Sequence, residues 1–128
     1  MKNKLENISA YYFLSQGLAG LVWWIVLIVS PPCRKMFLPI GVQEITLMGF
    51  WLADFIFFIL GSLYIAFMLF MGKRIKAEML WFIAGGISYA AVYCLGLSVI
   101  ANGGWLSTVI MLSAMSLSLF FVNEINDE

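Results

Sequence analysis

Long apolar stretches alternate with short clusters of charge along this chain of 128 residues. Residues 7–33 and 79–123 carry no charged side chain, and residues 45–72 carry only Asp54. A helix needs about 20 apolar residues to cross the hydrocarbon core of a bilayer. The first two of these stretches in chain order, 7–33 and 45–72, are each long enough for one crossing.

The third stretch is about twice as long as one crossing requires. Asn102-Gly103-Gly104, a combination typical of turns, interrupts it. We therefore predict four membrane-spanning helices, at about residues 9–30, 45–71, 79–101 and 105–122.

Composition supports the same fold class. Apolar residues make up 63% of the chain and charged residues 11%, with a mean hydropathy of +0.99. A soluble domain is about half apolar and about a quarter charged. The prediction is an all-α, polytopic membrane protein: one transmembrane domain over residues 1–128, a four-transmembrane-helix bundle with short loops in the lipid bilayer. Seven basic residues balance seven acidic ones, so nothing indicates a nucleic-acid partner.

A cleaved signal peptide is the alternative for the first span. Its apolar stretch is longer than the roughly 7–15 residues of a signal peptide's hydrophobic region, and no A-x-A site follows it. We expect the first span to be a helix of the mature protein.

The distribution of basic residues predicts the orientation. An even number of spans places both termini and the loop at 72–78 on one side, which holds five basic residues: Lys2, Lys4, Lys73, Arg74 and Lys76. The opposite side holds only Arg34 and Lys35. The positive-inside rule then predicts a multi-pass cell-membrane protein with cytoplasmic N and C termini.

The chain lacks the residues that metal binding and several kinds of catalysis usually require. The chain has no histidine, which is the commonest metal ligand and the usual general base near neutral pH. Cys33 and Cys94 are far apart and form no C-x-x-C pair, and no phosphate-binding or nucleophile motif is present. We predict no metal and no cofactor, and these features disfavour catalysis of the soluble-enzyme type.

Asp54 is the one ionisable residue deep within a span. It lies about 13 Å from the start of its helix, near the bilayer midplane, where an acid costs about 2.5–3.5 kcal/mol. We expect it to face the bundle and to find partners on polar faces of the first and third spans. The predicted intramembrane polar layer contains Asp54, Gln16 and either Tyr89 or Tyr93.

The segment from Pro31 to Gly41 combines prolines, apolar residues and the cations Arg34 and Lys35. The simplest interpretation is a connector in which the prolines stop one helix before the next begins. The alternatives are contact of Arg34 and Lys35 with lipid head groups, or guidance of an anion by Arg34.

A stripe of small residues marks the fourth span: Ser107, Met111, Ala114 and Ser118. Small residues allow membrane helices to approach closely. We expect this stripe to pack within the bundle. Contact with a second copy or another subunit is the alternative.

Three functions follow as hypotheses. The first is an accessory or assembly subunit that binds another membrane protein, which fits the absence of catalytic motifs. The second is a small oligomeric transporter or channel with Asp54 as a mid-membrane binding or coupling group. The third is the membrane part of a lipid-modifying enzyme, whose catalytic groups a partner would supply.

Overall fold

The computed structural model describes residues 4–127, and within this range it contains helices and no strands. Four helical segments are long and apolar enough to cross a membrane: Lys4–Val29, Glu44–Phe70, Ala77–Ala101 and Trp105–Asn126. They correspond to the four predicted spans. The prediction of an all-α four-helix bundle is confirmed, and the four apolar helices identify a multi-pass membrane protein.

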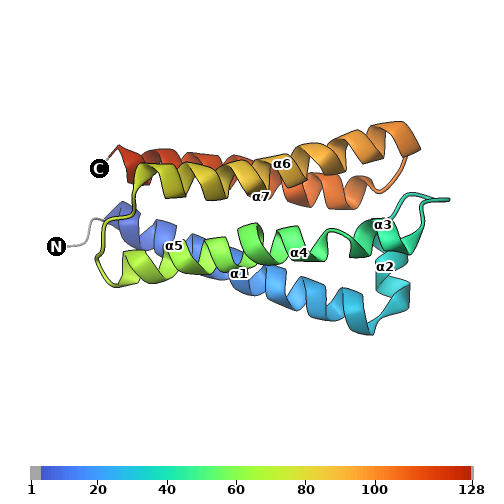
Figure 1. Ribbon diagram of the computed structural model, residues 1–128, viewed down its shortest axis with the longest axis horizontal. Coiled ribbons are helices and arrows are strands. Elements are labelled where there is room, and N and C mark those ends of the chain that lie inside the picture. Colours follow the sequence, from blue (N-terminus) through green and yellow to red (C-terminus); the bar gives the residue numbers. More distant parts are fainter. Residues whose placement is uncertain (1–3, 128) are drawn as a thin grey trace.

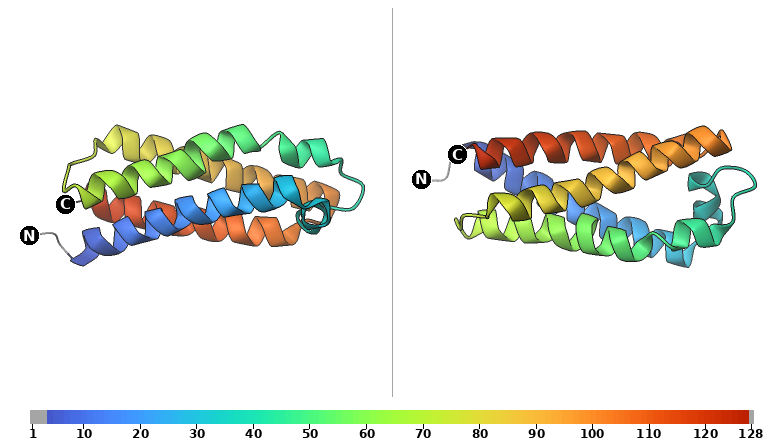
Figure 2. Two further views of the ribbon diagram at one scale, coloured as in Figure 1. Left: turned by 90° about the horizontal axis from the view of Figure 1, so that it is seen from below. Right: turned by 45° about the horizontal axis from the view of Figure 1, so that its top comes forward.

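The spans form two hairpins that pack against each other. In the first, α1 (Lys4–Val29) lies beside the second span; in the other, α6 (Ala77–Ala101) lies beside α7 (Trp105–Asn126) (Figure 1). The start of α1 and the end of α7 lie at one end of the elongated bundle, here called the terminal end, and α2 (Pro31–Phe37) lies at the opposite end, the α2 end (Figures 1 and 2).

The second span is divided into four segments rather than being one continuous helix. In chain order they are α3 (Glu44–Met48), α4 (Trp51–Ala53), the π-helix η1 (Asp54–Leu60) and α5 (Gly61–Phe70). The Gly61 N–H donates to the Ile56 carbonyl, five residues back, as a π-helix requires. The wider π turn begins at Asp54. Short π segments inside α-helices are frequent at functional sites.

The prolines after the first span have a second role. They stop α1 at Val29, as expected, but Pro31 also begins the short helix α2, which the sequence reading did not predict. Proline is favoured at the first helical position because its missing N–H would have no partner there. The connector therefore folds back over the α2 end of the bundle.

The turn between α6 and α7 is confirmed. Asn102 and Gly104 both have left-handed backbones, with φ of 49° and 69°, and the Gly103 N–H donates to the Ser98 carbonyl at 3.1 Å. A β-carbon at Gly104 would lie 2.9 Å from the Pro39 ring, so this turn packs closely on the chain that follows α2.

Apolar packing differs between the two halves of the bundle. The larger buried cluster joins all four spans and includes Phe13, Ile65, Ile87 and Val122. A smaller cluster toward the α2 end contains Trp24, Leu27 and Ile59 as its buried members. Asp54 lies beside this smaller cluster, where cavities remain between the helices.

Candidate functional site

The carboxylate of Asp54 accepts a hydrogen bond from the indole of Trp24. The Trp24 Nε1 atom lies 3.1 Å from Asp54 Oδ2, which joins the first span to the second. The Asp54 side chain points toward the bundle, because it bonds to Trp24 of α1 and borders cavities between the helices. Trp24 itself is buried, whereas Asp54 is only partly buried.

Three cavities between the helices share Asp54 as a wall residue. The α6-side cavity, of about 360 Å³, lies between η1 and α6 and is lined partly by Phe50, Ala53, Phe57, Gly86 and Tyr89. The α7-side cavity, of about 90 Å³, is lined partly by Gly20, Trp23, Phe58, Ile110 and Met111. The α2-end cavity, of about 50 Å³, is lined partly by Phe37, Pro39, Phe50, Cys94 and Ser107. Their walls are almost entirely apolar, so Asp54 provides their one charged group.

No cation balances Asp54 in the part of the chain that the structure describes. Across residues 4–127 the one ion pair joins Arg34 to Glu44, and the other basic side chains lie near the ends of the spans. Nor does that range hold a group of three or more His, Cys, Asp or Glu residues suited to a metal ion. Asp54 is thus a single acceptor in an apolar site with one neutral donor.

Gln16 belongs to a separate polar cluster in which Gln16, Ser62 and Ser118 are buried and Tyr12 is partly buried. Its Nε2 donates to Ser62 Oγ at 3.0 Å and to Ser118 Oγ at 3.1 Å, and Tyr12 donates to its Oε1. Tyr12 also lies 3.2 Å from the Ala114 carbonyl. The cluster joins α1, α5 and α7, and each of its polar groups has a partner.

The structure therefore divides the predicted polar layer in two. Gln16 does not share a hydrogen bond with Asp54 in the described residues, because Asp54 pairs with Trp24. Eight residues separate Trp24 from Gln16, which is about 12 Å along an α-helix. Trp24, with its partner Asp54, therefore lies at a different depth from Gln16, and the two groups do not form one layer.

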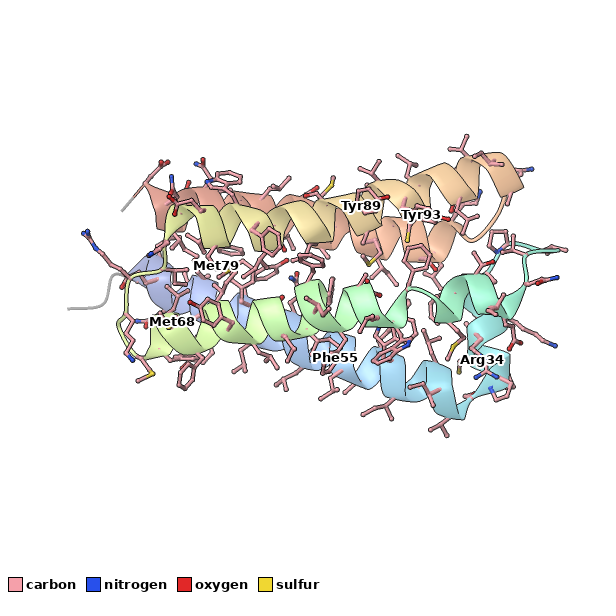
Figure 3. The ribbon with its side chains drawn as sticks, in the orientation of Figure 1. Arg34, Phe55, Met68, Met79, Tyr89 and Tyr93 are labelled. Carbon is pink, nitrogen blue, oxygen red and sulfur yellow. The ribbon has the colours of Figure 1, made fainter. Side chains whose placement is uncertain are left out.

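The two tyrosines of the predicted layer lie on α6 (Figure 3). Tyr89 borders the α6-side cavity together with Asp54, but 75% of its surface is exposed. Tyr93 packs edge-on against Phe50, with ring centroids 4.8 Å apart. The structure brings Tyr89 to the rim of the Asp54 cavity and gives neither tyrosine a hydrogen bond to the carboxylate within residues 4–127.

Arg34, at the α2 end (Figure 3), binds within the protein. Its Nη1 donates to the carbonyls of Leu27 and Ile28 at 2.9 and 3.2 Å, and its Nε donates to Glu44 at 3.0 Å. It therefore caps the last turn of α1, where a cation is favourable. Lys35 is exposed, so contact with a lipid head group stays a prediction for that residue.

The stripe on the fourth span packs within the bundle, as expected. Ser107 donates to the Phe37 carbonyl at 2.9 Å, and Ser118 belongs to the Gln16 cluster. Sequence reasoning missed Trp24 and Ser62. On the helical wheel of the first span, Trp23 shares the face of Tyr12, Gln16 and Gly20, and Trp24 is the next residue along the chain.

Comparisons of the chain with protein-family models, with curated proteins and with solved structures find no match.

Proposed function

We propose that the protein is a small membrane carrier or channel that binds its ligand at Asp54, between the two helical hairpins. The observation that carries this proposal is that Asp54 borders all three cavities without a counter-charge among residues 4–127. A charge within a membrane span is costly, and such residues usually mark a substrate or ion pathway. A carboxylate needed only for packing would be expected to be fully bonded, as Gln16 is.

Access to Asp54 would come from the side of the bundle. Ala53 and Tyr89 border the α6-side cavity and are exposed, so this cavity opens on a surface that faces lipid in a membrane-embedded bundle. At the α2 end, Phe37 and Pro39 cover the neighbouring cavity. Ligands that partition into the bilayer can reach Asp54 by the first route.

The orientation is part of this proposal. Lys73, Arg74 and Lys76 lie in the α5–α6 loop, at the same end as the start of α1 and the end of α7 (Figure 1). The positive-inside rule supports placing this end in the cytoplasm of a cell.

A second candidate is an accessory subunit that docks another membrane protein on α6. It is favoured by Gly85 and Gly96, because a β-carbon at either glycine would meet no atom within 4 Å. Tyr89 and Val92, between them, are also exposed on this helix. Small residues on an open face allow a partner helix to approach closely.

One experiment separates the two candidates. The wild-type protein and the variants Asp54→Asn and Gly85→Leu are extracted from cells with a native-membrane polymer, and native mass spectrometry measures the masses bound to each. Asp54→Asn removes the charge and keeps the shape, and Gly85→Leu fills the open face of α6 without touching the cavities.

A small molecule that accompanies the wild type and Gly85→Leu but is lost from Asp54→Asn is the result expected for a carrier. A protein that accompanies the wild type and Asp54→Asn but is lost from Gly85→Leu would instead establish the accessory role. Identical masses in all three preparations would contradict both candidates.

A further inference from the structure

We propose that the ligand of the Asp54 site is a lipophilic organic cation: an ammonium group attached to an apolar, preferably aromatic, body. This inference names the ligand class and rests on the proposed function. It follows from three features of the site: its charge, its aromatic lining and the shape of its cavities.

Charge favours a cation over other ligands. The Asp54 carboxylate has one recorded side-chain donor among residues 4–127, the neutral indole of Trp24. Arg34, a cation at the α2 end, is engaged by Glu44 and by the end of α1. A buried charge is stabilised when an opposite charge pairs with it, so a bound ammonium ion would supply the counter-charge that the protein lacks. An anionic ligand would meet repulsion and no basic group.

The cavity walls also suit a cation. Seven aromatic residues line the three cavities around the carboxylate: Trp23, Trp24, Phe37, Phe50, Phe57, Phe58 and Tyr89. The faces of aromatic rings attract cations, most strongly when water is excluded. Such rings also provide an apolar surface for the body of the ligand. Carboxylate and aromatic rings together match an ion that is both charged and lipophilic.

The cavity sizes indicate how such a ligand would lie. The α6-side cavity, of about 360 Å³, is large enough for an aromatic body and opens at Tyr89. The two cavities behind Asp54 are much smaller, at about 90 and 50 Å³. The ammonium group would therefore lie at Asp54, with its apolar body between η1 and α6.

The test compares two ligands of nearly the same shape. Benzyltrimethylammonium carries a positive nitrogen, and neopentylbenzene has a neutral carbon in its place. Binding of each is titrated by tryptophan fluorescence to the full chain in lipid nanodiscs, with empty nanodiscs as the reference for partitioning. The variants are Asp54→Asn and, as a matched control, Asn123→Asp, which adds an acid near the terminal end and far from the cavities.

We expect the wild type and Asn123→Asp to bind the cation at least about tenfold more tightly than the neutral compound, a difference of about 1.4 kcal/mol. Asp54→Asn should abolish this preference. Equal binding of both compounds by the wild type would overturn the cation assignment, and so would a preference that survives Asp54→Asn. Absence of binding by either compound would also overturn it.

The proposed function is judged separately. If the cation preference is absent but a small molecule accompanies the wild type and is lost from Asp54→Asn in the native mass spectra, the ligand class is wrong and the carrier proposal stands. If no such molecule is found and neither compound binds, both proposals fail.

Discussion

Trp24 and Asp54 lie 3.1 Å apart, nitrogen to oxygen, and form a hydrogen bond between the first and second spans. The bond fixes the carboxylate at the start of the π-helix and beside three cavities. Two neighbouring residues of a helix thus differ in role, because Trp23 packs on Phe37 while Trp24 binds Asp54.

Replacing Trp24 should therefore lower the free energy of unfolding by more than replacing Trp23 does. Trp24→Phe removes the donor to a partly buried carboxylate, and we expect a loss of about 1–3 kcal/mol in stability. Trp23→Phe makes the same change in side-chain size without removing a bond to Asp54, and it should cost less. The measurement is unfolding in mixed micelles with increasing SDS. A double-mutant cycle should give a coupling of about 0.5 kcal/mol or more between Trp24→Phe and Asp54→Leu. Equal losses of stability for Trp24→Phe and Trp23→Phe would contradict the hydrogen bond between Trp24 and Asp54.

The separation of the two polar groups can be tested in the same way. Gln16 and Ser118 share hydrogen bonds, so Gln16→Leu and Ser118→Ala should be coupled by about 0.6 kcal/mol, the average for polar contacts between membrane helices. Gln16→Leu and Asp54→Asn should be additive within about 0.5 kcal/mol, because no contact joins them in the described residues. Strong coupling of Gln16 to Asp54 would favour the single layer instead.

Adjacent glycines in α6 should respond differently to the same substitution. A β-carbon at Gly86 would overlap the Phe57 ring, whereas one at Gly85 would meet no atom within 4 Å. Gly86→Ala should lower stability by about 1–3 kcal/mol, as overpacking does. Gly85→Ala should be neutral or stabilising by up to about 1 kcal/mol, because alanine is the better helix former. Thermal unfolding of both variants in nanodiscs provides the comparison, and a similar loss in each would show that η1 does not pack on α6 as described.

The Arg34 cap predicts an asymmetry between two paired residues. Arg34→Met removes both the ion pair and the two bonds to the carbonyls of α1, so we expect a loss of about 1–2 kcal/mol. Glu44→Gln removes only an ion pair whose glutamate side chain is 42% exposed, which is worth about 0–1 kcal/mol. Chemical unfolding of the two variants measures the difference. Equal losses would mean that the cap contributes nothing.

Some features of the fold and of the site could be predicted from the sequence, and others could not. Charge-free stretches predicted the four spans because the cost of burying charge in lipid is large and acts on every residue. The burial of Gln16 followed from its place on a polar face of α1. The pairing of Asp54 with Trp24 did not, because the choice between adjacent tryptophans depends on the rotation and depth of α1 against the second span.

Two further features were not predicted from the sequence. The residues Asp54–Leu60 form a π-helix, yet their apolar composition is equally typical of an α-helix. The binding of Arg34 to the end of α1 depends on the fold of α2, which the two prolines begin rather than only interrupt. The π-helix depends on tertiary packing, whereas the start of α2 has a local signal in Pro31, at the favoured first position of a helix.

The binding site proposed at Asp54 requires that this residue can be reached from outside the bundle, and chemical labelling measures that access. In a background of Cys33→Ser and Cys94→Ser, Asp54→Cys is exposed in native membranes to a small membrane-permeant methanethiosulfonate, and labelling is followed by mass spectrometry. Ile65→Cys is the control, because Ile65 is 0% exposed and borders none of the three Asp54 cavities. A cavity that opens between η1 and α6 predicts labelling at position 54 and none at position 65. Failure to label position 54, or equal labelling at both positions, would contradict it.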